Sequence, residues 1–328
     1  MSRGVALAHP NIALAKYWGK RRRAGNYPAV PSLSVTLAGM STRTSVVLEA
    51  GLGADVLVLN GRQAEGEPLA RATELLDRLR AASGEARHAR VESANDFPTA
   101  SGLASSASGF AALALAAAHA MSLRWDVARI SDAARRSSAS AARSLFGGFV
   151  HLDAGAKEGP ESDVLAARAV APESQLDVRV LVCVTSEAEK DVSSRDGMNR
   201  TAKESPYYDA WLVDAEQVCA EMERALLARD LERVGTLTER SAFAMHASAF
   251  AAGVRYLRAA TLEVLDAVVA LRKRGLAAWA TMDAGPHVKV LVAASDAARA
   301  KQELTSVPGV LRILETSPGP GARLVEGP

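Results

Sequence analysis

The sequence predicts an α+β fold in two lobes, because strand-like segments followed by runs of helices occur twice along the chain. The first hundred residues are mostly strand-like, and an alanine-rich helical stretch begins at Gly102. A second apolar strand, at 176–184, precedes three more helical segments. A length of 328 residues also suits about two domains. The turn-rich stretch 154–162 is the best candidate for a surface loop or lobe boundary, and the strand that begins at residue 176 opens the second half, so we expect lobes at 1–175 and 176–328.

The first lobe is expected to contain strands interrupted by helices. Residues 32–48 alternate between apolar and polar, and the run 55–59 leads into Asn60-Gly61, a strong tight-turn signal. Residues 68–82 place leucine and alanine at helical spacing, and 88–93 have the composition of a strand. Further along, the expected elements are helices at 102–121, 127–136 and 140–145 and a strand at 149–152.

The second lobe is expected to combine one apolar strand with several helices. The strand at 176–184 is rich in valine and leucine, which suits a buried position in a sheet. The later expected elements are helices at 206–227, 231–247 and 254–274, strands at 277–282 and 288–292, and a final helix with short strands. Runs of helices after strands favour α+β over a regularly alternating α/β fold.

Charge patterning excludes a general polyanion-binding role. The chain has 39 basic and 37 acidic residues, interspersed, and a formal net charge of +2. The one basic run, 20–23, can be a solvated loop, although Lys20 is also a candidate for a small-anion site. No nucleic-acid partner is therefore expected.

Cysteine usage and hydropathy predict a cytoplasmic protein with no membrane segment. Cys183 and Cys219 are too few for a disulfide framework, and Cys183 lies within an apolar strand. Residues 4–15 are only mildly apolar and are interrupted by His9 and Pro10, unlike a signal peptide. The longest apolar helical stretch, 110–118, is far shorter than the roughly 20 residues of a membrane span.

The segment from Pro98 to Gly109 is built almost entirely from small residues. Small side chains let a backbone approach an anion closely, and the helix that follows would present unpaired N–H groups to it. The hydroxyls of Ser105 and Ser106 could add contacts to a phosphate or to magnesium. The segment lacks the Gly-Lys-Ser/Thr of a Walker A loop. A serine-capped helix that packs closely for structural reasons is the alternative.

Residues 11–20 contain two lysines that flank an aromatic pair. Lys16 and Lys20, with Tyr17 and Trp18 between them, suit an anion site with an apolar wall. If the segment is extended, Tyr17 points away from the lysines unless the chain turns at Gly19. A half-buried strand with its lysines at the solvent edge is the alternative.

Residues 136–148 combine several serines with one candidate anion-binding arginine. Ser138 or Ser140 could cap a helix, and Arg143 could share the face of Ser140. A guanidinium suits a planar bidentate partner such as a carboxylate or phosphate. The alternative is a capped surface helix whose arginine is solvated.

Asp283 is an isolated acid between an apolar strand and the sequence Ala-Gly-Pro. Burial and a rigid turn at this position could fix a carboxylate, although a turn-forming aspartate is the alternative. His287 follows closely but has no second histidine at a ligand-like spacing, so metal ligation by histidine is not expected.

Taken together and in this order, these segments resemble the mevalonate diphosphate decarboxylases, a family of the GHMP small-metabolite kinase superfamily. The sequences KYWGK, RSLFGG and MDAGP are specific to that family, whereas the superfamily shares the small-residue loop. The likeness runs over nearly the whole chain. It implies a GHMP-kinase-like fold whose first lobe is similar to the second domain of a small-subunit ribosomal protein. The second lobe would be an α/β sandwich that carries the catalytic aspartate.

The resemblance implies ATP-dependent decarboxylation of mevalonate 5-diphosphate to isopentenyl diphosphate, with release of ADP, phosphate and CO₂. It makes Asp283 the catalytic acid–base residue, Lys16 the lysine beside it and Arg143 the arginine that holds the substrate carboxylate. The implied substrate-binding residues are Tyr17, Lys20, Arg71, Ser138, Ser140, Ser194 and Arg195. The implied ATP-binding residues are Pro98, Gly102, Leu103, Ala104, Ser105 and Ser106. The resemblance also implies Mg²⁺ with the ATP phosphates, Ser106 as its candidate ligand, and a homodimer.

Three positions depart from the family pattern and leave other substrates open. Ser137 and Ala139 stand where the family usually has glycines, so that loop must use ordinary φ values, and His287 stands where asparagine is common. The alternatives are a mevalonate 5-phosphate decarboxylase, a mevalonate 3-kinase, and a non-catalytic or nucleic-acid-binding module. Asp283 and Lys16 together speak against a simple 3-kinase, because the family uses both for decarboxylation.

Overall fold

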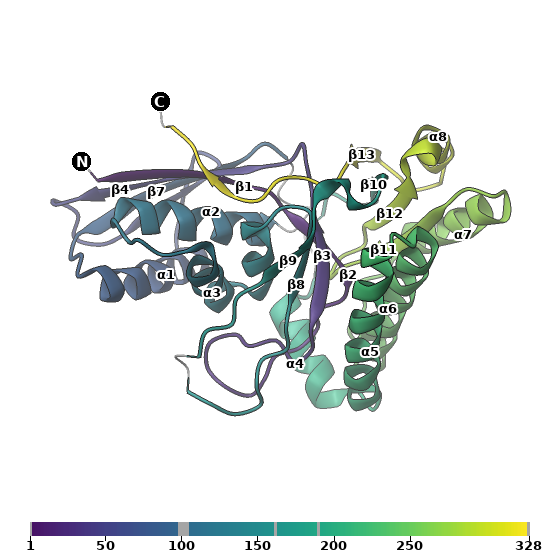
Figure 1. Ribbon diagram of the computed structural model, residues 1–328, viewed down its shortest axis with the longest axis horizontal. Coiled ribbons are helices and arrows are strands. Elements are labelled where there is room, and N and C mark those ends of the chain that lie inside the picture. Colours follow the sequence, from purple (N-terminus) through teal and green to yellow (C-terminus); the bar gives the residue numbers. More distant parts are fainter. Residues whose placement is uncertain (1, 98–104, 161–162, 189–190, 327–328) are drawn as a thin grey trace.

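The computed structural model describes residues 2–97, 105–160, 163–188 and 191–326, and these residues form three sheets surrounded by helices (Figure 1). The six-stranded sheet lies in one half of the molecule, and helices dominate the other half. The prediction of a mixed fold of strands and helices in two lobes is confirmed.

The six-stranded sheet has the strand order β14-β1-β4-β7-β5-β6. β5 pairs with β7 in parallel, and the other neighbouring strands of this sheet are antiparallel. The expected turn at Asn60-Gly61 connects β5 and β6, and both residues have the positive φ that a tight hairpin needs. Its strands are β1 (Arg3–Ala8), β4 (Thr42–Glu49), β5 (Val56–Leu59), β6 (Arg62–Ala64), β7 (His88–Asn95) and β14 (Arg323–Leu324).

Helices α1 (Glu67–Ser83) and α2 (Ser105–Ala120) pack against this sheet, and α3 (Val127–Ser137) packs against both helices. Alanines let α2 lie very close to the sheet. At Gly4 of β1, a Cβ atom would come within 2.0 Å of the carbonyl oxygen of Ala116. This close packing holds the C-terminal half of α2 against β1.

A four-stranded sheet of order β2-β3-β8-β9 forms the centre of the molecule. Its apolar side chains, such as Leu33 and Phe149, share a core with Val218 and Met222 of helix α5. This sheet therefore connects the two lobes. The elements of this layer are β2 (Asn11–Ala15), β3 (Ser32–Thr36), β8 (Phe149–Leu152), β9 (Arg168–Ala171) and α5 (Tyr208–Leu227).

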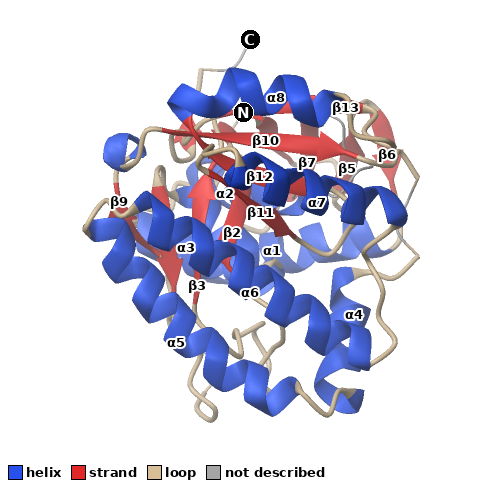
Figure 2. Ribbon diagram, turned by 90° about the vertical axis from the view of Figure 1, so that its right-hand side faces the viewer, coloured by secondary structure: helices blue, strands red, loops and turns tan. Residues whose placement is uncertain are grey.

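The second four-stranded sheet has the order β11-β12-β10-β13. Val290 and Val292 face a core with helices α7 and α8, while Leu291 faces α5 and α6 on the other side. Figure 2 shows α7 and α8 beside β10 and β12 in the view onto this lobe. The elements are β10 (Val178–Val184), α6 (Leu231–Ala251), α7 (Ala259–Lys273), β11 (Ala278–Met282), β12 (Val288–Ala293), α8 (Ala297–Thr305) and β13 (Arg312–Thr316).

The structure differs from the sequence-based expectations at several elements. Helix α7 begins at Ala259 and not at residue 254, because the backbone N–H of Arg258 donates to the hydroxyl of Thr261 and caps the helix there. The expected helix at 140–145 is a 3₁₀-helix, η1 (Ala139–Leu145). Helix α4 (Ser194–Glu204) was not predicted, because few of its side chains are apolar. The short strands β6 and β9 were also not predicted.

The end of the chain returns to the sheet of the first lobe. β14 pairs antiparallel with β1, so both ends of the described chain lie on the same side of the molecule (Figure 1). Helix α4 of the second lobe approaches α1 of the first, and Arg195 lies 3.6 Å from Glu67. Among the described helices, none is long and apolar enough to cross a membrane.

Candidate active site

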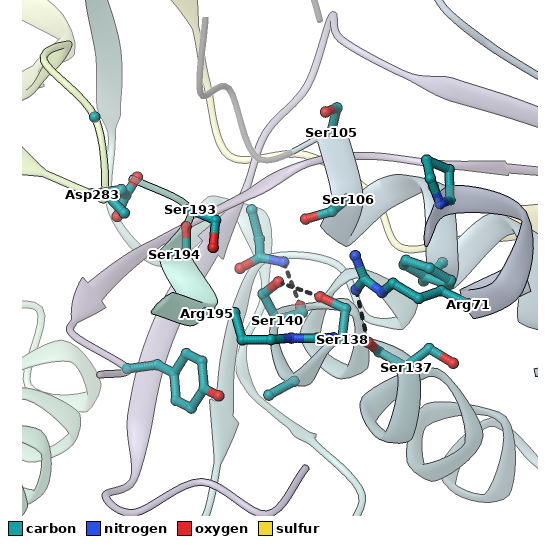
Figure 3. A pocket seen from close by; sticks show the side chains of 18 of the residues that line it. Arg71, Ser105, Ser106, Ser137, Ser138, Ser140, Ser193, Ser194, Arg195 and Asp283 are labelled. Carbon is teal, nitrogen blue, oxygen red and sulfur yellow. Dashed lines mark hydrogen bonds between the residues drawn. The ribbon is translucent and has the colours of Figure 1, made fainter. Parts of the chain in front are cut away.

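A cavity of about 1040 Å³ lies where the two lobes meet. Figure 3 shows serine and arginine side chains from several elements around one space, with Asp283 and Arg71 on opposite sides of it. The segments that the sequence singled out therefore converge, although they are far apart along the chain. The expected residues that line the cavity are Lys16, Tyr17, Lys20, Arg71, Ser105, Ser106, Ser138, Ser140, Arg143, Ser194, Arg195 and Asp283.

Lys16 and Asp283 form an ion pair at this cavity. Lys16 directly follows β2 and is buried, and its Nζ donates to Asp283 Oδ1 at 2.7 Å and to the carbonyl of Ala13 at 2.8 Å. Asp283 directly follows β11 and keeps 29% of its side chain exposed. The chain turns after Asp283, where the N–H of Gly285 donates to its carbonyl. The two alternatives, solvent-edge lysines and a merely turn-forming aspartate, are wrong for Lys16 and Asp283.

The charges around Asp283 keep its carboxylate ionised. Burial would raise the pKa of Asp283, but the positive charges of Lys16 and Lys289 and their hydrogen bonds lower it below its ordinary value. Burial lowers the pKa of Lys16, and the charge of Asp283 opposes this shift. Lys289 of β12 lies 3.0 Å from Asp283 Oδ2, so each carboxylate oxygen has its own lysine.

Lys289 and His246 are neighbours of this pair that the sequence pattern did not single out. The sequence signal that could have identified Lys289 is a single lysine within the otherwise apolar strand VKVLVA. His246 of α6 is buried, and burial followed by the charge of Lys16 lowers its pKa to about 4. His246 is therefore neutral at pH 7 and adds no charge beside Lys16.

Arg143 is a fully buried guanidinium within η1. Its Nη1 donates to the hydroxyl of Ser32 at 2.7 Å, and its Nε donates to the hydroxyl of Ser34 at 3.1 Å. Burial lowers the pKa of Arg143 to about 10, so it stays protonated at pH 7. Within the described part of the chain, no carboxylate forms a salt bridge with it. A buried charge without an ionic partner is costly, which suits a site that an anionic ligand completes.

Three cations gather at another part of the cavity. Burial, followed by the charges of Arg195 and Arg71, lowers the pKa of Lys20 to about 8. Lys20 Nζ donates to Asn26 Oδ1 at 2.6 Å, and Arg71 donates to the carbonyl of Ser137 at 2.9 Å. Mutual repulsion of Lys20, Arg71 and Arg195 would be relieved by a polyanion between them.

The hydroxyl-bearing candidates are arranged around these cations. The hydroxyl oxygens of Ser138 and Ser140 lie 3.1 Å apart, and both residues line the cavity. The prediction that one of them caps a helix is wrong: Ser138 stands before η1 with an extended backbone, but its side chain makes no capping bond. Tyr17 also lines the cavity, because the chain leaves the β2 strand after Ala15 and turns at Gly19 with φ +104°.

Comparison with known proteins identifies the family. A family model described as the diphosphomevalonate decarboxylase-like N-terminal domain matches residues 8–166. A second, described as the mevalonate 5-diphosphate decarboxylase C-terminal domain, matches residues 180–315. Diphosphomevalonate decarboxylase of Candida albicans is 32% identical over 95% of this chain and 94% of its own length. The chain belongs to the diphosphomevalonate decarboxylase family.

Solved structures of the family have the same fold over almost the whole chain. Mevalonate diphosphate decarboxylase from Staphylococcus aureus is 33% identical, with a TM-score of 0.91 over 99% of this chain and 98% of its own. A structure described as MDDEF in complex with MVAPP, AMPPCP and magnesium is 36% identical. Its TM-score is also 0.91, and 99% of each chain is covered.

The part of the cavity next to α2 combines serine hydroxyls with apolar side chains. Ser105 and Ser106 begin α2 and line the cavity, whereas Pro98, Gly102, Leu103 and Ala104 lie outside the described residues. Apolar side chains from β5, β7 and α2 form a wall suited to a flat base, and the two hydroxyls suit phosphate oxygens. The apolar wall consists of Leu57, Leu59, Val91, Phe110 and Leu113.

The departures from the family pattern have local structural explanations. Ser137 and Ala139 have no positive φ, as the sequence predicted for these non-glycine residues. His287 is buried, and its Nδ1 accepts the backbone N–H of Thr185 at 3.2 Å, so the imidazole ties the Asp283 turn to the end of β10. Among the described residues, no group of three or more His, Cys, Asp or Glu side chains could hold a metal ion.

Proposed function

We propose that this protein catalyses the ATP-dependent decarboxylation of mevalonate 5-diphosphate to isopentenyl diphosphate, with release of ADP, phosphate and CO₂. The observation that carries the proposal is the 2.7 Å contact between Lys16 and Asp283 at a cavity that also contains Arg143 and a cluster of cations. Membership of the diphosphomevalonate decarboxylase family supports the same activity.

Asp283 orients the 3-hydroxyl of the substrate and accepts its proton late in phosphoryl transfer. An ordinary carboxylate with a pKa near 4 is about 12 units less basic than the alkoxide of an alcohol comparable to water. That gap corresponds to roughly 16 kcal/mol, so early and complete deprotonation is excluded. The two lysines lower the pKa of Asp283 and widen the gap. A loose, metaphosphate-like transfer needs little activation of the nucleophile.

Lys16 faces the phosphoryl group during transfer and during its departure from C3. The group of Lys16, Asp283 and Lys289 holds two positive charges and one negative charge, so its net charge is positive. Two charges about 4 Å apart interact by about 4 kcal/mol at an effective dielectric constant of 20. The group therefore stabilises the departing phosphate more than it stabilises positive charge at C3.

Arg143 holds the carboxylate that is lost as CO₂, and the cluster of Lys20, Arg71 and Arg195 holds the 5-diphosphate. Tyr17, Ser138, Ser140 and Ser194 complete the walls around the substrate body. The resemblance implies these assignments, and the position of each side chain at the cavity supports them, as do the charges of the four cations. They leave the carboxylate and the diphosphate at separate parts of the cavity, with C3 near Asp283.

ATP is the phosphoryl donor in this proposal, and Mg²⁺ accompanies its phosphates. Ser105 and Ser106 contact the phosphates, and the Ser106 hydroxyl is the candidate ligand of the ion. Magnesium would neutralise charge on the transferring phosphoryl group. A related structure contains the ATP analogue AMPPCP and magnesium according to its description, which supports both assignments. A cytoplasmic location stays a prediction from the sequence, and a homodimer stays a prediction from the resemblance.

The charge cluster predicts a preference for the 5-diphosphate over the 5-monophosphate. Each added hydrogen bond to a charged group contributes about 1.5–3 kcal/mol, so kcat/KM should be about 10- to 150-fold higher for the diphosphate. CO₂ release measured with each substrate and MgATP tests this preference. In Arg195→Gln the ratio of kcat/KM for the diphosphate to that for the monophosphate should fall, because the cluster loses one positive charge. Arg195 is half-exposed, so it can be replaced without opening the core. A higher kcat/KM for the monophosphate would instead support a mevalonate 5-phosphate decarboxylase.

A non-catalytic, nucleic-acid-binding module is the alternative from a different class. The cations described above converge inside a cavity and do not form a stripe along a surface. Such a module would bind RNA with strong salt dependence. RNA binding at low salt, in a protein that releases no CO₂, would support that alternative.

A further inference from the structure

Lys289 lies on the side of Asp283 opposite to Lys16. Its Nζ is 3.0 Å from Oδ2 of Asp283, whereas the Nζ of Lys16 is 2.7 Å from Oδ1. Asp283 and Lys16 line the cavity, and Lys289 is absent from the described residues that do so. Lys289 therefore contacts the carboxylate from the protein interior and has no place beside the substrate.

The position of Lys289 in its strand makes a buried charge unavoidable. Side chains alternate between the two faces of β12: Val288, Val290 and Val292 face the core with α7 and α8. Lys289 points to the other face, where Leu291 packs into the central core. The side chain of Lys289 is only 2% exposed. Burial of an ammonium group is costly unless it is paired, and Asp283 is its salt-bridge partner within the described residues.

We propose that Lys289 is a positioning residue, which holds Oδ2 of Asp283 so that the ionised carboxylate keeps one fixed orientation towards Lys16 and the substrate. Without it, the carboxylate could rotate about its side-chain bonds, because Lys16 alone contacts a single oxygen. This inference rests on the proposed function, in which Asp283 orients the 3-hydroxyl. A misplacement of about 1 Å in a catalytic group can lower a rate about 100-fold.

The charged and titratable groups around Asp283 determine how loss of Lys289 would change the pKa of Asp283. Lys16 follows β2, Arg143 lies in η1, and His246 faces the same region from α6. His246 has a pKa of about 4 and is neutral above pH 5. Burial would raise the pKa of Asp283, and Lys16 and Lys289 oppose this effect. Removal of one nearby opposite charge should raise a carboxyl pKa by about 1–3 units.

The test compares Lys289→Met and Lys289→Gln with the wild-type protein. Methionine removes both the charge and the hydrogen bond, whereas glutamine retains a donor for Oδ2. We expect kcat for CO₂ release to fall about 10- to 100-fold in Lys289→Met and less in Lys289→Gln. In both variants, the acidic limb of the kcat profile should move upward by about 1–3 pH units, because Asp283 would be protonated at higher pH. Lys301→Met is the control, because it removes an exposed lysine that pairs with Glu315.

Thermal stability and the affinity for an ATP analogue are measured on the same variants. An unchanged acidic limb with reduced stability would overturn the proposal, since a structural lysine would not alter the titration of Asp283. Failure of both variants to fold would also overturn it, because the role of Lys289 would then be structural. Absence of CO₂ release by the wild-type protein would reject the proposed function itself, before any variant is compared.

Discussion

Replacement of Asp283 by asparagine is expected to remove turnover while ATP and mevalonate 5-diphosphate still bind. Asparagine has nearly the same shape, but it cannot accept the proton of the 3-hydroxyl and carries no negative charge. Lys16 and Lys289 would then face a neutral amide, and the 2.7 Å and 3.0 Å ion pairs would be lost. CO₂ release at saturating substrate measures the loss, and equilibrium binding of both ligands shows whether the cavity is intact.

The expected loss of activity in Asp283→Asn exceeds a factor of 10. A variant that keeps more than roughly a tenth of the wild-type rate would have a barrier change below about 1.4 kcal/mol, too small for the group that orients the hydroxyl. Two buried lysines without their carboxylate would also lower stability, so the melting temperature is measured alongside. Glu315→Gln is the matched control, because it also replaces a carboxylate by its amide, next to the exposed Lys301.

Replacement of Arg143 by methionine is expected to lower kcat/KM for the mevalonate substrate more than kcat/KM for ATP. Arg143 is buried, is protonated at pH 7 and has no salt bridge to the described carboxylates. Loss of one partner of a buried, hydrogen-bonded charge pair costs about 2–5 kcal/mol, so kcat/KM for the mevalonate substrate should fall by at least about 30-fold. Steady-state kinetics with each substrate varied in turn would measure the two effects.

A substrate analogue without the carboxylate separates recognition from a structural role of Arg143. Wild-type protein and Arg143→Met should bind this analogue with similar affinity, because the group that Arg143 holds is missing. Ser32→Ala is the control, since it removes the 2.7 Å hydrogen bond of Arg143 Nη1 but leaves its charge. If Arg143→Met lowers the affinity for the analogue as much as the affinity for the substrate, then Arg143 shapes the cavity and does not recognise the carboxylate.

The sequence predicts the identity of the central residues better than their arrangement. Lys16, Arg143 and Asp283 lie in the motifs that carry the resemblance, and an isolated acid after an apolar strand is visible without any comparison. Their convergence is not visible, because Lys16 and Asp283 are 267 positions apart and meet only when β2 and β11 both pack against α6. Which distant elements pack together depends on the folded core, and the local spacing of residues in the sequence does not reveal it.

The missed and mistaken features have physical reasons of the same kind. Helix α4 has few apolar side chains, so hydrophobic periodicity does not reveal it, although it contains Ser194 and Arg195. Ser138 has the composition of a cap, but its hydroxyl is close to that of Ser140 and makes no capping bond. Lys289 breaks an apolar strand pattern, yet only the folded structure identifies Asp283 as its partner.

The most direct test of the central claim is the stoichiometry of ADP and CO₂ produced from mevalonate 5-diphosphate and MgATP by the wild-type protein. The arrangement of Lys16, Asp283 and Arg143 predicts one CO₂ for each ADP, with isopentenyl diphosphate as the organic product. ADP without CO₂ would identify a 3-kinase. Formation of neither product would contradict the proposed function.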